Sequence, residues 1–217
     1  MVTTTTFRPA EVLLRAFHDR QTGHAIVTKL LPAGLGTDAR AKAHCLWLAD
    51  HDLGVVHVRS SVPLREDLLG TIEAQVEEPV RHIGETVDVT LSVACQYTPS
   101  ADIPMELRTV LKQNGHAYRS RLVPVPEDRR SEWVTARLLK SGLQLDPSSL
   151  TTSKLTHADL GKRGGGIPYI TLTVSGTVVD ADSFNSAIAH GIGKGKTFGL
   201  GLLLVSSPSS NPRSITP

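Results

Sequence analysis

The sequence predicts an α+β protein made of two tandem ferredoxin-like domains, each with the strand and helix order βαββαβ. Three observations predict it. The 217 residues show this order of patterns twice, and proline, asparagine and glycine interrupt the segment between the two halves, Gln96 to Gly115. Hydrophobic residues make up 40% of the chain and aromatic residues only 4%, so the cores must be largely aliphatic. We expect domains over residues 1–97 and 118–205, a linker over 98–117 and a disordered tail over 206–217.

In the first half, one helix and the last strand have the clearest patterns. Apolar residues from Ile26 to Leu31 recur at helical spacing, and the pattern ends at Pro32. Apolar residues alternate from Val87 to Val93, which is typical of a strand that is buried on one face. The expected elements are a strand over Glu11 to Phe17, a helix over Gln21 to Leu31, a hairpin of strands over Ala43 to Leu48 and Val55 to Ser60, two helical turns over Arg65 to Ile72, and a strand over Glu85 to Cys95.

The second half repeats this order after a connection that contains one expected helical turn, Leu107 to Leu111. The expected elements are a strand over Tyr118 to Val125, a helix over Glu127 to Ser141 that ends at Gly142, strands over Ser153 to Ala158 and Tyr169 to Val179, a helix over Asp180 to Ala189, and a strand over Gly199 to Val205. RNA-recognition domains share this architecture but stack bases on aromatic residues of their strands. Because the strands expected here have almost none, binding of nucleic acid would depend on phosphate contacts from helices and loops.

Charge is unevenly distributed along the chain, although the net charge is only +2. Residues 1–107 carry 9 Lys and Arg against 14 Asp and Glu, residues 108–163 carry 11 against 5, and the remainder carries 3 against 2. Such a basic zone is typical of a nucleic-acid-binding surface, although a solvated surface helix would have a similar composition. Its members include Arg119, Arg121, Arg129, Arg130, Arg137, Lys140, Lys154, Lys162 and Arg163.

Membrane, secreted and metal-binding classes find no support in the sequence. No apolar run is long enough to cross a bilayer, and residues 1–9 lack the pattern of a signal peptide, so we expect a cytoplasmic protein. Cys45 and Cys95 are too few for a disulfide framework and form no metal-spaced pair, which favours two buried thiols. No metal-binding motif occurs, and no metal site is expected.

The segment Gly191 to Gly201 contains five glycines and two lysines. Backbone without a Cβ can approach an anion closely, and lysine supplies the opposite charge. A nucleotide P-loop is excluded, because its first glycine would fall at His190 and because the segment follows a helix pattern and precedes a strand pattern. The segment therefore indicates a cradle for the phosphates of a polynucleotide. The alternative is a glycine-rich turn that only packs the last helix on the sheet.

This segment, continued to Leu203, resembles the C-terminal glycine-rich signature of the repeat-associated (RAMP) CRISPR proteins, and specifically of the CasE family of type I-E pre-crRNA endoribonucleases. Further landmarks follow the family's order over most of residues 10–205. Val58 to Pro63 resembles its strand before the second helix, Leu122 to Val125 with Trp133 and Lys140 resembles its "VP…W…K" helix, and Ile170 to Val179 resembles the strand that leads into the last helix. The glycine signature is specific to the superfamily, and the narrower assignment depends on the order of all landmarks.

The resemblance implies a metal-independent endoribonuclease that binds the hairpin repeat of CRISPR precursor RNA. Cleavage by the 2′-hydroxyl would leave a 2′,3′-cyclic phosphate or 3′-phosphate and a 5′-hydroxyl on the mature crRNA. No cofactor is implied, and the other subunits of a type I-E effector complex, Cascade, are implied partners. The family's catalytic histidine lies at the start of the first helix, shortly before a proline, and His24 before Pro32 occupies that place. The tyrosine that often precedes it is replaced by Asp19 to Gln21, so the second proton-transfer group stays open.

The residues expected to act in this reaction have two roles. His24 is expected to transfer a proton, since an imidazole changes protonation state near neutral pH, and His18 is its nearest rival. Lys196, Lys29 and Lys154 are expected to stabilise the phosphate, although Lys29 is about as readily explained as a solvated helix residue. The residues expected to bind RNA are Arg119, Arg121, Arg129, Arg130, Arg137, Lys162, Arg163, Gly193, Lys194, Gly195, Gly199 and Gly201.

Two other functions remain open at this point. A catalytically silent RNA-binding subunit of the same superfamily would have the same fold and glycine loop, but no functional histidine near the scissile phosphate. A nucleotide-hydrolysing enzyme would need a true P-loop and an acidic magnesium ligand, and the sequence shows neither.

Overall fold

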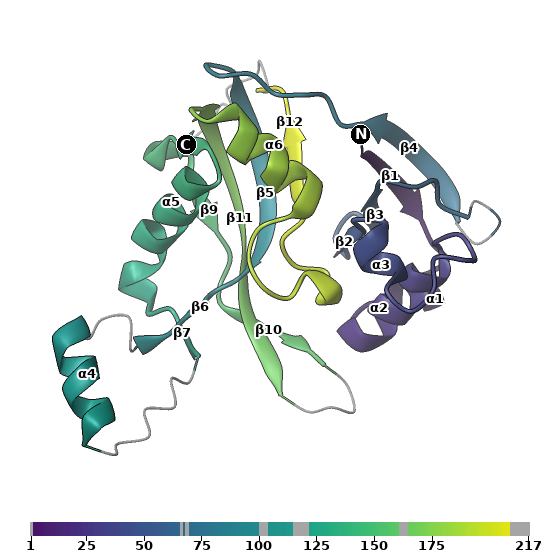
Figure 1. Cartoon of the computed structure of the whole chain (residues 1–217). Helices are drawn as coiled ribbons and strands as arrows, with labels where there is room; N and C mark the ends of the chain where they lie inside the picture. The colour runs from purple at the N-terminus through teal and green to yellow at the C-terminus, as the bar shows by residue number, and fades with distance from the viewer. Residues whose placement is uncertain are drawn as a thin grey trace, which may run out of the picture.

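The first third of the chain folds around a four-stranded antiparallel sheet with the order β2-β3-β1-β4. Its elements are β1 (Thr3–Arg8), α1 (Glu11–Ala16), α2 (Arg20–Lys29), α3 (Ala39–Lys42), β2 (Leu46–Asp50), β3 (Val55–Ser60) and β4 (Thr71–Glu77). The computed structural model describes residues 2–65, 67, 70–99, 104–114, 122–160 and 165–208 (Figure 1). Phe7, Phe17, Val27 and Trp47 form the centre of the buried core between this sheet and α2.

The second unit is built around the long antiparallel pair of β5 and β11, in which Tyr169 lies opposite Ala94 and Thr177 opposite Thr86. Its elements are β5 (Thr86–Ala94), β6 (Gln96–Tyr97), α4 (Met105–Gln113), β7 (Val123–Pro124), η3 (Glu127–Arg129), α5 (Arg130–Lys140), β8 (Leu143–Leu145), η4 (Pro147–Ser149), β9 (Thr151–Thr152), β10 (Thr156–Asp159), β11 (Gly166–Val178), α6 (Ala181–His190), η6 (Lys196–Phe198) and β12 (Leu203–Ser206). β12 pairs with the free side of β5, and β8, β9 and β10 pair with β11. Helices α5 and α6 pack on this sheet through a second core that includes Leu138 and Phe184.

The predicted fold class is confirmed. The order β2-β3-β1-β4 in the first sheet and β8-β11-β5-β12 in the second are both the ferredoxin-like order, so the protein is an α+β chain of two tandem ferredoxin-like units. The helices expected before Pro32, after Pro126 and before Gly191 are α2, α5 and α6. The hairpin of β2 and β3 and the alternating strand β5 are also present as expected.

Two expected elements have a different secondary structure from the one predicted. Glu11 to Phe17 was expected as a strand but forms α1, and the first strand is instead the threonine-rich β1, which β-branched side chains favour. Thr71 and Ile72 were expected at the end of a helix but begin β4. The remaining residues of that expected helix include 66, 68 and 69, which lie outside the described residues. The same holds for residues 118–121 of the strand expected over Tyr118 to Val125 and for residues 209–217 of the tail.

Strand β5 was expected to close the first sheet, but it pairs with β11 and β12 in the second. The chain therefore passes from one sheet to the other between β4 and β5, before the linker expected over residues 98–117. The strands β6 and β7 flank that expected linker and pair with each other, and α4 lies within it. An alternating pattern shows that a strand is buried on one face, but it carries no information about which sheet the strand joins.

The two units meet along an apolar seam. Leu46 and Leu48 of β2 form a small buried cluster with Leu202, which lies just before β12. The loop after α6 reaches across this seam towards α2 (Figure 1), and η6 within it packs against α2.

Among the helices of the described ranges, none combines the length and the apolar composition needed to span a membrane.

Candidate functional site

Helix α2 carries His24 at the side of the first unit that adjoins η6. The helix begins after Asp19, whose carboxylate accepts hydrogen bonds from the Thr22 hydroxyl (2.7 Å) and the Gln21 backbone N–H (2.9 Å). These bonds, that of Thr22 first, lower the pKa of Asp19. A Cβ on Gly23 would lie 2.6 Å from Cη2 of Trp47. Glycine next to His24 therefore lets α2 close on this indole.

The Trp47 side chain connects the helix of His24 to the loop of Lys196. It is fully buried, and its Nε1–H donates a hydrogen bond of 3.1 Å to the backbone oxygen of Thr197 in η6. Its ring also contacts Gly199, where a Cβ would lie 2.8 Å from Cζ3. A single indole thus holds α2 and η6 together, and brings the predicted proton-transfer helix beside the predicted phosphate-binding turn.

The five glycines of the loop all have positive φ, between +72° and +83°. A Cβ on Gly201 would lie 2.3 Å from the backbone oxygen of Ile192, and a Cβ on Gly195 would lie 2.8 Å from Cδ1 of Leu200. Backbone conformation and packing therefore explain these glycines, as the sequence interpretation of a glycine-rich packing turn states. A Cβ on Gly193 would meet Nη1 of Arg137 at 3.0 Å, so this glycine brings the loop backbone close to a cation.

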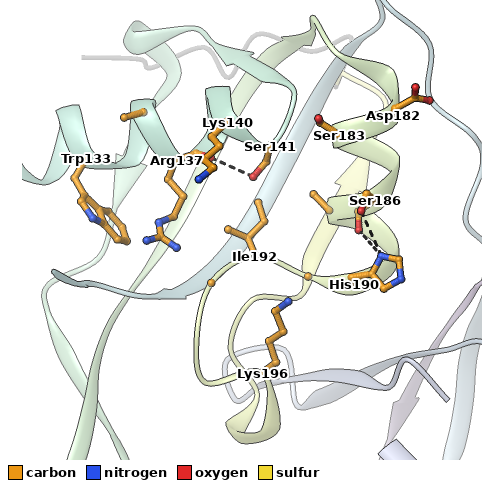
Figure 2. A pocket seen from close by; sticks show the side chains of 14 residues that line it. Trp133, Arg137, Lys140, Ser141, Asp182, Ser183, Ser186, His190, Ile192 and Lys196 are labelled. Atoms are coloured by element: carbon orange, nitrogen blue, oxygen red, sulfur yellow. Dashed lines mark hydrogen bonds between the residues drawn. The ribbon is translucent and has the colours of Figure 1, made fainter. Parts of the chain in front are cut away.

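A groove of about 890 Å³ lies between α5, α6 and the glycine loop. Figure 2 shows Arg137 projecting into it from α5 and Lys196 projecting towards it from the loop. Lys140 and His190 also line it, and Asp182 is the one carboxylate in its described lining. The groove therefore has a cationic lining, which suits a polyanion.

Several of these groups are partly desolvated. Burial lowers the pKa of Lys196, and the charge of Arg40 lowers it further. Burial also lowers the pKa of Arg137, whose Cζ lies 4.5 Å from the centre of the Trp133 ring. Partly desolvated cations have lost some of their hydration already, so an anion that binds them displaces less water.

The ring of His190 lies at the end of the groove. Its Nδ1 lies 3.0 Å from the backbone oxygen of Ser186 (Figure 2). Because a carbonyl oxygen only accepts, Nδ1 must carry the hydrogen, and in the neutral ring Nε2 is then the unprotonated nitrogen. The ring also stands edge-on to His44 of the first unit, with 4.9 Å between centroids.

A second hollow, of about 530 Å³, lies at the start of α5 and contains Lys154 and Arg130. The Nε–H of Arg130 donates a hydrogen bond of 3.2 Å to the backbone oxygen of Val125. Neither residue lines the groove of Lys196. The structure therefore separates Lys154 from the loop lysine with which it was grouped.

The structure brings some predicted residues together and separates others. Lys196, Arg137 and Gly193 share the groove, and η6 with Lys196 packs against the helix of His24. Lys29 is exposed and follows His24 by five residues, which is a rotation of about 140° around the helix. Lys194 is exposed, and Cζ of Arg129 lies 5.4 Å from the Tyr97 ring. Arg119, Arg121, Lys162 and Arg163 lie outside the described residues.

His18, the rival of His24, stacks on His51 with 3.9 Å between ring centroids. Burial, followed by the charges of His18 and Arg20, lowers the pKa of His51. Sequence reasoning treated these histidines singly, and it missed both this pair and the pair of His44 and His190. It also missed Arg20 and Tyr169, which meet across 149 positions of sequence, so no local pattern could have indicated their contact.

The chain resembles known proteins in both sequence and structure. A family model described as CRISPR associated protein matches residues 6–207. A search of curated proteins finds no match. Among solved structures, Thermus thermophilus Cse3 bound to an RNA representing a pre-cleavage complex has a TM-score of 0.70 at 18% identity, with 94% of this chain and 98% of that chain covered.

Two further structures share the fold. Cas6e from Escherichia coli str. K-12 has a TM-score of 0.64 at 15% identity, with 96% of this chain and 100% of that chain covered. A chain of a CRISPR RNA-guided surveillance complex has a TM-score of 0.58 at 16% identity, with the same coverage. The match to the family model extends over nearly the whole sequence, and the chain therefore belongs to the family of CRISPR-associated proteins.

Proposed function

We propose that this protein is an endoribonuclease that binds the hairpin repeat of CRISPR precursor RNA and cuts it to give mature crRNA. The observation that carries the proposal is the packing of α2, with His24, against η6, with Lys196. A side chain that transfers protons and a cation that binds phosphate thereby come from different units to one junction. The shared fold with the CRISPR endoribonuclease Cse3 bound to RNA supports the same conclusion.

The reaction proposed is attack of a 2′-hydroxyl on the adjacent phosphorus. The bond from the 2′-oxygen to phosphorus forms, the bond to the 5′-oxygen breaks, and the products are a 2′,3′-cyclic phosphate and a 5′-hydroxyl. The protein must hold the three reacting atoms in line, transfer protons and stabilise the charge of the phosphorane. His24 would transfer a proton, and Lys196 would stabilise the charge. These steps use side chains alone.

RNA binding is assigned to the cationic groove and to its surroundings. Arg137, Lys140 and Lys196 line the groove, and Lys154 and Arg130 line the second hollow. Phosphate contacts of this type position an RNA without reading its bases. After cleavage, the crRNA and the other subunits of a type I-E effector complex are the proposed partners, as the chain of a CRISPR RNA-guided surveillance complex with the same fold suggests.

The experiment is cleavage of a hairpin repeat RNA in EDTA, beside the same RNA with one 2′-deoxy substitution just upstream of the cut. We expect the unmodified RNA to be cut and the deoxy RNA to bind with nearly the same affinity but stay intact, because it lacks the nucleophile. A strict requirement for magnesium would contradict the mechanism. Tight binding of the unmodified RNA without cleavage would replace the enzyme with the silent RNA-binding subunit.

A further inference from the structure

Arg20 is a buried cation with an unusual environment. Only 6% of its surface is exposed, and its Cζ lies 5.6 Å from the ring centres of both Trp47 and Tyr169. No carboxylate within the described part of the chain forms an ion pair with it. Its Nη1 is buried against Gly199 and has no hydrogen-bond partner among the described residues.

This environment is costly for a structural residue. Burial of a charge without an opposite charge is unfavourable, and attraction to two aromatic faces offsets only part of that cost. An apolar side chain of similar length would fill the same space without the cost. The guanidinium therefore indicates a role for its charge or for its hydrogen bonds.

The hydrogen bond that Arg20 makes is directed at Tyr169. Its Nη2–H donates to the phenolic oxygen over a long distance of 3.4 Å. A guanidinium has no acceptor, so the hydrogen of the phenol must point away from Arg20. Tyr169 lies on β11 and is half-buried, which leaves part of its surface open. The phenol is thus held by its oxygen while its proton remains available to another acceptor.

The pair lies close to the proposed reaction. His24 follows Arg20 by four residues on α2, and side chains at this spacing lie on the same side of a helix, about 5–6 Å apart at Cβ. Helix α2 also contacts β10, the neighbour of β11, as well as η6 with Lys196. The phenol of Tyr169 and the imidazole of His24 are therefore brought to the same junction from different units.

We propose that Tyr169 is the acid of the cleavage reaction and that Arg20 is its positioning residue, an inference that rests on the proposed function. As the 2′-oxygen bonds to phosphorus, its proton passes to the imidazole of His24. As the bond from phosphorus to the 5′-oxygen breaks, that oxygen takes the proton of the Tyr169 hydroxyl. Proton exchange with water then restores both side chains. Tyr169 touches the leaving group, whereas Arg20 acts through Tyr169.

The test is single-turnover cleavage by Tyr169→Phe of two hairpin RNAs, one natural and one with sulfur in place of the 5′-bridging oxygen. An alkoxide needs a proton to leave, but a thiolate does not, since a thiol has a pKa of about 8.5. We expect the natural RNA to be cut at least about 10²-fold more slowly than by the parent, and the sulfur RNA to be cut at nearly the parent rate. His24→Ala should be slow on both RNAs.

Results that contradict the inference can be told apart from results that contradict the proposed function. Equal losses on the two RNAs would assign Tyr169 to packing, and parent-like rates on both would remove it from the reaction, while the proposed function would survive either result. Failure of the parent to cut either RNA would instead overturn the proposed function and this inference with it. Tyr97→Phe is the matched control, because Tyr97 also lies beneath an arginine, Arg129 at 5.4 Å, but on β6. It should cut both RNAs like the parent.

The role of Arg20 is tested by whether the effect of its substitution on cleavage depends on Tyr169. Arg20→Met should slow cleavage of the natural RNA and leave the sulfur RNA nearly unaffected, and Arg20→Lys should restore part of the loss. The double variant with Tyr169→Phe should be no slower than Tyr169→Phe alone, since residues that act as one unit are not additive. Additive losses would show that Arg20 does not act through Tyr169.

Discussion

Two buried arginines of the first unit reach the second unit, and they differ in their charge partners and in their hydrogen bonds. Arg59 is fully buried, ion-paired to Glu78, and hydrogen-bonded to Thr4 Oγ1 and to the backbone oxygen of Ile188, both at 2.9 Å. Arg20 lies between two aromatic rings, has one long hydrogen bond, and has no carboxylate partner within the described residues. Both side chains contribute to the junction, but Nη1 of Arg20 has no hydrogen-bond partner among the described residues.

The difference separates a structural role from a functional one. Burial lowers the pKa of Arg59 and the charge of Glu78 raises it, so the guanidinium keeps its charge with a partner beside it. Through Ile188, this pair holds the end of α6, from which the glycine loop departs. At the other end of the junction, Arg20 contacts the loop at Gly199, and no carboxylate in the described part of the chain pairs with it. We therefore expect changes at Arg59 to reduce stability, and changes at Arg20 to reduce activity.

The largest expected effect is the loss of stability in Arg59→Met. This change leaves the carboxylate of Glu78, whose side chain is only 9% exposed, without its partner. Removal of one member of a buried pair typically costs about 3–5 kcal/mol. Urea denaturation should show this loss, whereas Arg20→Met should change the free energy of unfolding by less than about 1.5 kcal/mol.

Two further results would sharpen or break the contrast. The double variant of Arg59→Met with Glu78→Gln should recover part of the stability, because the orphaned charge is then gone. Equal losses of stability in Arg59→Met and Arg20→Met would show that the two arginines have the same structural role.

A smaller effect is expected at Gly199, which lies at the Arg20 end of the junction. Gly199 and Gly84 have φ of +72° and +85°, but a Cβ on Gly199 would lie 2.8 Å from Trp47, whereas a Cβ on Gly84 has no atom within 4 Å. Gly84→Ala should therefore cost about 1–2 kcal/mol from backbone strain alone. Gly199→Ala should cost about 1–3 kcal/mol more from overpacking, and should also slow cleavage.

The paired measurement is urea denaturation with a cleavage assay on each folded variant. Similar losses of stability at the two glycines would mean that the contacts of Gly199 with Trp47 and Arg20 are unimportant. Cleavage should stay close to that of the parent in Gly84→Ala, since this glycine lies between β4 and β5, outside α2, η6 and the lining of the groove.

The smallest effect concerns the salt dependence of RNA binding. Arg137 and Lys140 line the open groove, whereas Nη1 of Arg20 is buried and cannot reach a phosphate in this conformation. Replacement of Arg137 and Lys140 by alanine should flatten the slope of log K against log salt by about 1.4–1.8 if each residue contacts one phosphate. Arg20→Met should leave the slope unchanged, and an equal change in both variants would contradict the distinction.

Sequence patterns predict many of the helices and strands of this fold, but they predict few of the contacts at the junction of the two units. Local patterns identify α2, α5, α6 and β5, because burial of one face imposes a period on the sequence. The same patterns could not show that β5 joins the second sheet, since both sheets offer an apolar face to it. The sequence indicates the glycine loop as a phosphate cradle, with packing as the alternative. The structure explains the glycines by positive φ and close packing, whereas phosphate binding stays a prediction.

In the candidate site, too, the sequence predicts single residues but not the contacts between the two units. His24 was identified by the family resemblance, which places the catalytic histidine shortly before a proline, and the structure adds that its helix packs on η6. The contact of Arg20 with Tyr169, and that of Trp47 with Thr197, join residues about 150 positions apart. Such contacts depend on how the two units dock, which no periodicity or spacing within one element encodes.

The most direct test of the account is single-turnover cleavage and equilibrium binding of hairpin repeat RNA by His24→Ala, with His18→Ala as the control. Removal of a positioned proton-transfer group should slow cleavage by about 10²–10⁴-fold and leave the affinity nearly unchanged, because a neutral imidazole contributes little to phosphate binding. His18 stacks on His51, and its variant should cut close to the parent rate. Cleavage by His24→Ala at the parent rate would contradict the account.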